Sequence, residues 1–317
     1  MAERAARFEG KVVFITGAAR GQGRSHAVKF ASEGAKIIGV DVCSDLPECY
    51  YPLATEADLA ETVKLVESAG GVMHAEVGDV RDLPRLREVV NAGYERFGRL
   101  DVIVANAGTY SPNPTQFLTS EQWDETIGIN LTGVFNTVRA ALPAVMQARG
   151  YVLINASVSS FAHPPVMSAY AASKSAVEAM GNSWRIELAS HGVDVGVVHA
   201  GWVSTPLVTE GALHPGFVRL RATMPGPLNS ETSPQDAARA IVRGMQARKG
   251  RIWIPGWLRI LYALRALLHL PFAERELRRA APEIEAIYIE GLEAEGALAS
   301  SFGPRERERT LARGRGE

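Results

Sequence analysis

The sequence predicts an α/β fold: a doubly wound parallel sheet of seven strands with helices on both faces, followed by a helical C-terminal extension. Two observations lead to this prediction. Short, nearly continuous apolar runs alternate with amphipathic stretches of helix length from Lys11 onward, and each run ends at Gly, Asn, Asp or Ser. Strands buried on both faces have this pattern, because helices cover both faces of a parallel sheet.

The expected strands follow the chain in order, and a helix over about 22–33 connects the first two. After the last strand the composition changes, since 257–272 is apolar with two arginines and 274–317 is rich in Arg and Glu. We therefore expect one domain over 1–255 and an appended extension over 256–317. The strands are expected at 12–16, 36–41, 72–77, 101–106, 151–157, 194–200 and 251–255.

The composition excludes several classes of protein. With 46% hydrophobic and 22% charged residues the chain is globular, and its net charge of −1 gives no overall field for nucleic acid. The first ten residues are polar and charged, without the apolar run of a signal peptide, so we expect a cytoplasmic protein. Cys43, Cys49 and the seven histidines lack the spacing of metal ligands, which predicts reduced thiols and no metal site.

A glycine-rich turn joins the first strand to the first helix. Gly17, Gly21 and Gly23 allow a tight turn, so backbone N–H groups can approach a pyrophosphate at the positive end of the helix. Asp41 ends the second strand, where a carboxylate accepts hydrogen bonds from the adenosine ribose and repels a 2′-phosphate. This pattern favours NAD over NADP. Arg20 points the other way, and a plain turn residue is the alternative for Asp41.

Tyr170 and Lys174 lie four residues apart, so on a helix they share a face. A nearby cation favours the phenolate, and we expect Lys174 to lower the pKa of Tyr170 from about 10 toward neutrality. Ser157, thirteen residues before the tyrosine (170 − 157), is placed to hydrogen-bond a developing oxyanion. Tyr170 would then be a usable proton donor and acceptor. The alternative is a solvated helix face.

With these motifs in this order, residues 8–255 resemble the short-chain dehydrogenase/reductase family. The motifs are TGAARGQG at 16–23, Asn106-Ala107-Gly108, Asn130, Ser157 and YAASK at 170–174. The resemblance implies a Rossmann-type NAD-binding catalytic domain and a catalytic tetrad of Asn130, Ser157, Tyr170 and Lys174. The implied cofactor-binding residues are Gly17, Arg20, Gly21, Gln22, Gly23, Asp41, Asp79, Val80, Asn106, Ala107, Gly108, Tyr170, Lys174 and Thr205.

Each position has a role by this resemblance. Asp79 and Val80 would contact adenine, Thr205 would hold the nicotinamide carboxamide, and Lys174 would hold the nicotinamide ribose. Asn130 would bind a water that leads protons to Lys174, or it is a structural amide that ties two helices together. The chain departs from the family in two places: Ala200-Gly201 replaces the usual Pro-Gly, and Ser157 lacks its usual serine neighbour, which leaves Ser159 as a weaker candidate.

Residues 42–54 form a longer connection than an α/β unit needs. From residue 17 through this insertion to the helix after it, the sequence looks like the mycofactocin-coupled branch of the family, which includes carveol dehydrogenases. In that branch the insertion is thought to cover the cofactor, so NAD stays bound between turnovers. The alternative is a surface loop that packs its tyrosines.

The remaining segments concern the substrate. The apolar stretch 206–233, with Trp202 and Phe161 nearby in sequence, predicts a lid over a hydrophobic secondary alcohol or ketone, such as a terpenoid, a steroid or a lipid-like compound. Residues 257–272 are too few to span a bilayer. An amphipathic helix there would lie on a membrane surface, cover the active site, or pack on its own domain or a neighbouring subunit.

We therefore expect an oxidoreductase that transfers a hydride between NAD and a small hydrophobic alcohol or ketone, and that forms a homodimer or homotetramer. A nicotinoprotein with non-exchanging NAD is the alternative. A non-catalytic dinucleotide-binding regulator would need a broken tetrad, and all four residues are present.

Overall fold

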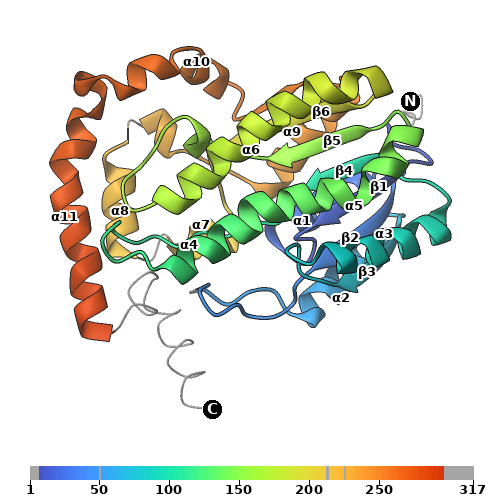
Figure 1. The fold of residues 1–317 in the computed structure, drawn as a ribbon, viewed down its shortest axis with the longest axis horizontal. Coiled ribbons are helices and arrows are strands. Elements are labelled where there is room, and N and C mark those ends of the chain that lie inside the picture. The colour runs from blue at the N-terminus through green and yellow to red at the C-terminus, as the bar shows by residue number, and fades with distance from the viewer. Residues whose placement is uncertain (1–6, 50, 212–213, 225, 296–317) are drawn as a thin grey trace.

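The computed structural model describes residues 7–49, 51–211, 214–224 and 226–295. Seven parallel strands form one sheet in the order β3-β2-β1-β4-β5-β6-β9, with helices on both faces (Figure 1). The expected doubly wound fold is confirmed. The strands are β1 (Val12–Thr16), β2 (Lys36–Asp41), β3 (Val72–Val77), β4 (Val102–Ala105), β5 (Tyr151–Asn155), β6 (Asp194–Ala200) and β9 (Arg251–Ile254).

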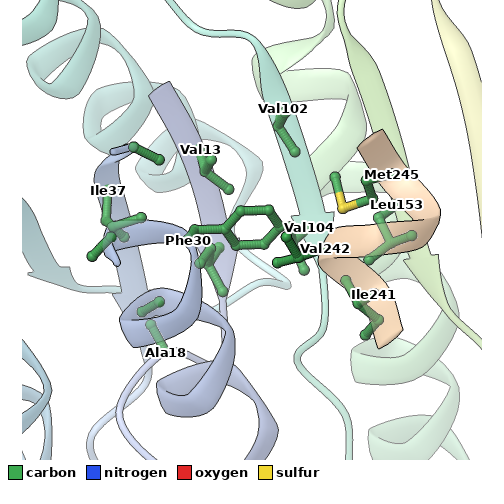
Figure 2. Packing of buried hydrophobic residues seen from close by; sticks show 14 of the residues in the cluster. Val13, Ala18, Phe30, Ile37, Val102, Val104, Leu153, Ile241, Val242 and Met245 are labelled. Carbon is green, nitrogen blue, oxygen red and sulfur yellow. The ribbon is translucent and has the colours of Figure 1, made fainter. Parts of the chain in front are cut away.

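Two hydrophobic cores lie on the two faces of the sheet, which explains the continuous apolar runs. Along β1, Val13 and Ile15 point into one core, and Val12 and Phe14 into the other. Figure 2 shows Phe30 near the centre of the first core. Its helices are α1 (Gly21–Ala31), α2 (Glu56–Ser68) and α9 (Pro234–Gln246); those of the second core are α3 (Leu83–Phe97), α5 (Gly133–Gln147) and α6 (Ser168–Glu187).

The order of the strands places the site. Beside β1 the sheet continues in one direction to β2 and in the other to β4, and all pairings are parallel. In such a sheet ligands bind beyond the carboxyl ends of the strands at this switch point, because the two connections diverge and leave a crevice. The glycine turn follows β1 and Asn106 follows β4, so both stand at this edge.

The segment 206–233 forms helices rather than an extended loop. The two ends of this segment are joined by a short pair of parallel strands, Trp202–Val203 and Glu231–Thr232. This pair was not expected from the sequence. Residues 212–213 and 225 of this segment lie outside the described residues. Its elements are α7 (Pro206–Gly211), α8 (Pro215–Ala222), the 3-10 helix η4 (Gly226–Asn229) and β8 (Glu231–Thr232), with β7 (Trp202–Val203) before it.

The expectation of one amphipathic helix over 257–272 is wrong. The helix α10 (Leu258–Ala263) ends early, the 3-10 helix η5 (Arg265–His269) follows, and a long helix, α11 (Pro271–Glu295), begins at a proline. Leu270 has extended backbone (φ −81°, ψ 146°) because the ring of Pro271 disfavours a helical conformation in the residue before it. Residues 296–317 of the extension lie outside the described residues.

A third hydrophobic core joins the extension to the rest of the protein. Figure 1 shows α11 beside α8. This third core holds buried side chains from the insertion, the loop after β4, the residue before α6, the segment 206–233 and α11, and Tyr170 packs at its margin. None of the described helices combines the length and the hydropathy of a membrane span. The buried members are Cys49, Tyr51, Tyr110, Met167, Leu220, Ala280, Ile284 and Tyr288.

Candidate active site

The glycine turn after β1 is closely packed. Gly17 has φ +67° and Gly21 φ +55°, which L side chains rarely adopt. A Cβ at Gly23 would lie 1.9 Å from the carbonyl oxygen of Gly17, so the turn and the start of α1 touch through their backbones. The Asn106 amide donates to the carbonyl oxygens of Thr16 (3.0 Å) and Gly17 (3.3 Å) and holds the turn against the end of β4.

A cavity of about 170 Å³ opens beside this turn. It is bounded by the end of β2, the end of β3 and the strand ends of β1 and β4. Most of the expected cofactor-binding residues therefore lie around one space. Those that line it are Gly17, Arg20, Gly21, Gln22, Asp41, Asp79, Val80, Asn106, Ala107, Gly108 and Thr205.

Asp41 is held in place by the turn. Its Oδ2 accepts a hydrogen bond from the backbone N–H of Ala19 (2.9 Å), and Oδ1 accepts a longer one from Cys43 (3.4 Å). Burial raises the pKa of Asp41, while these hydrogen bonds and the Arg20 charge act in the opposite direction. The carboxylate is thus fixed at the rim of the cavity.

The insertion 42–54 forms one wall of the same cavity, through Leu46, Tyr51 and Leu53. The guanidinium of Arg20 lies 5.6 Å from the centroid of the Tyr51 ring. The Tyr51 hydroxyl is 3.4 Å from the hydroxyl of Thr109, just after β4. Tyr50 of the insertion lies outside the described residues. The insertion therefore packs Tyr51 against the site, and a covering role over the cofactor stays a prediction.

A second, larger cavity of about 510 Å³ adjoins the first, and Gln22, Asn106, Gly108, Thr205 and Leu207 line both. Three members of the expected tetrad line it. The rest of its wall is mainly apolar and comes from the residues after β6, the segment 206–233 and the extension. The lining residues include Ser157, Tyr170, Lys174, Trp202, Leu207, Val208, Phe217, Met224, Leu228, Trp257, Leu261, Leu268 and Leu277.

The expected lowering of the Tyr170 pKa by Lys174 is wrong for the described structure. Burial raises the pKa of Tyr170, and the hydrogen bond with Ser157 opposes this only in part. Lys174 lies 5.6 Å from the centroid of the tyrosine ring, but it is itself buried, and burial lowers its pKa to about 8. Spacing along a helix gives the distance between two groups but not their desolvation, which dominates here.

Lys174 is held by the strand beside it. Its Nζ donates to the backbone carbonyl of Asn155 at the end of β5 (2.9 Å). A Cβ at Gly108 would lie 3.5 Å from this Nζ and 3.2 Å from Oδ1 of Asn130. A side chain at Gly108 would therefore crowd the Asn130 amide and only touch the lysine nitrogen.

Asn130 lines neither cavity. Its Oδ1 accepts from the N–H of Thr109 (2.8 Å), and its Nδ2 donates to the carbonyl of Thr109 (2.8 Å) and to the hydroxyl of Ser173 (3.1 Å). The side chain therefore ties the loop after β4 to α6, and its expected place in the tetrad stays a prediction. Residues Gly128–Thr132 form a π-helical turn between α4 (Ser120–Ile127) and α5, a feature that the sequence did not reveal.

Several lining residues were not identified from the sequence. The backbone carbonyl of Asn155 accepts the hydrogen bond from Lys174, and the Asn155 side chain donates to the side-chain oxygen of Asn106 (3.2 Å). His163 and His269 stack with their ring centroids 5.2 Å apart and line the larger cavity. The spacing of Ser157, Tyr170 and Lys174 predicts a catalytic region, but no local signal shows which residues of the extension fold over it.

Comparison with known proteins defines the class. The sequence model of the short chain dehydrogenase family matches residues 11–215, which is more than half of the chain. The protein belongs to the short-chain dehydrogenase family, and the expected oxidoreductase class is confirmed.

Relatives narrow the resemblance. The chain is 40% identical over 251 residues to an uncharacterized NAD-dependent oxidoreductase of Mycobacterium tuberculosis, covering 76% of this chain and 91% of the relative. It is 42% identical over 209 residues to (-)-trans-carveol dehydrogenase of Rhodococcus erythropolis, covering 64% and 74%.

Solved structures agree with this grouping. A short chain dehydrogenase from Mycobacterium paratuberculosis bound to NAD has a TM-score of 0.71 at 38% identity, over 78% of this chain and 97% of that one. Carveol dehydrogenase from Mycobacterium avium in complex with NAD has a TM-score of 0.72 at 33% identity, over 78% and 96%. The expected resemblance to carveol dehydrogenases is confirmed.

Proposed function

We propose that the protein transfers a hydride between NAD and a hydrophobic secondary alcohol or ketone, with Tyr170 as the general acid and base. The observation that carries this proposal is the position of Tyr170, Ser157 and Lys174. They line the apolar cavity next to the place where it joins the cavity of the glycine turn. A substrate and a dinucleotide in these two spaces would meet at the tyrosine.

The residues around the smaller cavity fit NAD. The backbone contact between Gly23 and Gly17 leaves no side chain between a pyrophosphate and the N-terminus of α1. The fixed carboxylate of Asp41 suits ribose hydroxyls and disfavours a 2′-phosphate. Asp79, Val80 and Thr205 would bind the adenine and nicotinamide ends. NAD supplies the hydride acceptor or donor.

The protein's own groups handle the proton. In ketone reduction Tyr170 gives its phenolic proton to the carbonyl oxygen, and in alcohol oxidation it takes that proton back. Ser157 hydrogen-bonds the same oxygen where negative charge develops. Lys174, anchored on the Asn155 carbonyl and 5.6 Å from the centroid of the Tyr170 ring, would hold the nicotinamide ribose.

The substrate class follows from the wall of the larger cavity. About 510 Å³ is in the range of cavities for small molecules, and the lining is dominated by Leu, Val, Phe, Met and Trp side chains. The relatives named carveol dehydrogenase support a terpenoid alcohol, while the size also admits steroid or lipid-like compounds.

The Tyr170→Phe variant tests the reaction. We expect turnover of hydrophobic alcohols, measured by nicotinamide absorbance, to fall by at least about 1000-fold, because the proposed proton donor and acceptor is removed. The affinity for NAD, measured by calorimetry, should stay within about threefold. Substantial residual turnover would overturn the assignment of Tyr170. A wild-type protein that binds NAD and oxidises no alcohol in a broad panel would instead be a dinucleotide-binding regulator.

As a second candidate we propose a nicotinoprotein that keeps NAD bound. The packing of the insertion supports it, since Tyr51 contacts both Arg20 and the Thr109 loop and so fastens the wall over the smaller cavity. NAD should then co-purify with the protein, and added NAD⁺ alone should not sustain turnover. Free exchange of radiolabelled NAD⁺ on the timescale of one turnover would rule out this form.

For partners, we propose that 257–272 touches an anionic membrane surface. Its outward side chains are large and apolar, with Phe272 71% and Ile260 58% exposed. The only charges from 256 to 273 are Arg259 and Arg265. The inward side of the same segment lines the substrate cavity.

Sedimentation with vesicles of phosphatidylcholine, with and without phosphatidylglycerol, tests this contact. We expect binding only with the anionic lipid, and its loss in Phe272→Ser. Ile186→Ser, on α6, is the matched control because Ile186 is also exposed (80%) but lies outside this segment. Light scattering that shows a dimer in the wild-type protein and a monomer in Phe272→Ser would place 257–272 between two copies and contradict the proposal. A homodimer or homotetramer and a cytoplasmic location stay predictions.

A further inference from the structure

A buried carboxylate outside the catalytic groups collects several partners. Glu178 lies on α6, one turn after Lys174, and is buried. Its Oε2 accepts a hydrogen bond from the hydroxyl of Ser160 (2.5 Å), and its Oε1 accepts one from the hydroxyl of Tyr262 (2.7 Å). Nε2 of the fully buried His199, on β6, lies 3.0 Å from Oε2.

The partners explain why an ionised group tolerates this position. Burial by itself would raise the pKa of Glu178, but contacts with His199, Ser160 and Tyr262 lower it to about 2. An ionised carboxylate that accepts two short hydrogen bonds from hydroxyl groups holds both groups firmly, because hydrogen bonds to a charged group are stronger than those between neutral groups. Removal of one donor therefore weakens the attachment of the segment that carries it.

One of the two donors belongs to the turn that carries Ser157. The 3-10 helix η2 (Val158–Ser160) starts directly after Ser157, whose Oγ accepts from the N–H of Ser159 (3.1 Å) and whose carbonyl accepts from the N–H of Ser160 (3.1 Å). Ser175 on α6 also donates to the carbonyl of Ser160 (3.0 Å). The conformation of this short turn thus sets the direction of the Ser157 hydroxyl.

The other donor belongs to the extension. Tyr262 is on α10, and its ring meets the Phe161 ring edge to face at 5.2 Å between centroids. The guanidinium carbon of Arg265 lies 4.2 Å from the centroid of the Tyr262 ring, and that of Arg251 lies 5.4 Å from it. Phe161 directly follows η2, so Tyr262 touches the Ser157 turn by packing and through the shared carboxylate.

We propose that Glu178 and Tyr262 are positioning residues: the shared carboxylate fastens the C-terminal extension to the turn of Ser157, so that docking of α10 sets the orientation of the Ser157 hydroxyl. The kinetic part of this inference rests on the proposed role of Ser157 in hydride transfer. The mechanical coupling between the two segments does not.

Hydrogen exchange on the full chain tests the coupling without any substrate. In Tyr262→Phe, which keeps the ring and removes one hydroxyl, we expect protection of the backbone amides to fall about tenfold both in 258–263 and in 158–161. The control is Tyr94→Phe, since the Tyr94 hydroxyl on α3 makes a long bond to Gln147 on α5 (3.4 Å) and so involves neither of the two segments. Glu178→Gln should reproduce the double effect. Loss of protection in 258–263 alone, or in neither segment, would overturn the proposal.

Kinetics with a hydrophobic alcohol separate positioning from a merely structural role. Tyr262→Phe should lower kcat about tenfold and leave both KM and the affinity for NAD nearly unchanged, because the cavity wall stays intact. In a Ser157→Ala background the same change should have no further effect on kcat. Additive losses, or a rise in KM alone, would contradict positioning through Ser157. If the wild-type protein turns over no alcohol, the proposed function fails, and the exchange result still decides the coupling.

Discussion

The half of the molecule around the glycine turn and the half around the third core are built differently. The first consists of β1, α1 and β2, which are consecutive in the chain and meet through backbone contacts such as Gly23 with the Gly17 carbonyl. The third core gathers side chains from positions as distant as Cys49, Leu220 and Tyr288. The first half offers one fixed shape to a cofactor. In the second half, the cavity wall comes from separate chain segments, so its side chains can change independently of one another.

This difference matches the division of labour in the proposed reaction. The phosphates of a dinucleotide are bound by backbone N–H groups, and the close glycine contacts allow no larger side chain at these positions. A hydrophobic substrate is recognised by the shape of an apolar wall, and large side chains from separate segments define that shape. The family model ends at residue 215 and so leaves out the whole extension.

Gly23→Ala should have the largest effect, and it should disturb the glycine turn without affecting the third core. A Cβ there would lie 1.9 Å from the backbone oxygen of Gly17, so the turn must move. We expect NAD affinity, measured by calorimetry, to fall by about 1000-fold, or ~4 kcal/mol. Gly256→Ala is the control, because its Cβ would meet no atom within 4 Å. Unchanged NAD binding in Gly23→Ala would show that the turn does not hold the pyrophosphate.

Ile284→Ala should damage the third core and spare the sheet. Ile284 on α11 is fully buried, and truncation of a buried isoleucine costs about 3 kcal/mol. We expect hydrogen-exchange protection to fall in 258–292 and KM for a hydrophobic alcohol to rise, with NAD affinity unchanged. If the amides of β1 and β4 lose protection equally, the two halves unfold as one unit and the comparison fails.

Asp41→Asn should change the choice of cofactor without disturbing the turn. The amide oxygen can still accept from the N–H of Ala19, while the negative charge at the rim is removed. We expect the preference for NAD over NADP, as a ratio of kcat/KM values, to shrink on the order of 100-fold, or about 2.7 kcal/mol. Asp124→Asn, an exposed carboxylate that lines neither cavity, should leave the ratio unchanged.

His26→Leu should have the smallest effect, a change in the free energy of unfolding that is seen only at acidic pH. Neither ring nitrogen of His26 on α1 has a hydrogen-bond partner among the described residues, and burial lowers its pKa to about 4. The unfolded chain binds a proton near pH 6.5 and the folded one only near 4, so stability falls as the pH drops through this window. Between pH 7 and 5 the loss is about 2 kcal/mol.

Urea denaturation at both pH values checks this prediction, and the loss between pH 7 and 5 should disappear in His26→Leu. The ionised Glu178 acts in a lower window, between about 4.5 and 2, so it should not mask the result. An unchanged acid slope in the variant would mean that His26 is not the group that titrates.

Much of the first half was predictable because its signals are local. The apolar runs, the glycine turn and Asp41 all lie within thirty residues, and the helical spacing of Tyr170 and Lys174 placed both side chains on one cavity. The extension was not predictable in the same way. Its break at Leu270 has a local cause in Pro271, yet nothing local indicates that Tyr262 would reach Glu178, 84 residues earlier.

The sequence by itself determined the strands of the sheet, where each strand ends, and which groups lie at the candidate site. Hydrophobic period, turn residues and spacing are properties of neighbouring residues, so they can be read from the sequence. Only the tertiary structure decided the ionisation of those groups and the shape of the substrate cavity. Burial raises the pKa of Tyr170 and lowers that of Lys174, and α10 and α11 close the wall. Desolvation and long-range packing depend on residues far away in the chain, so no local pattern records them.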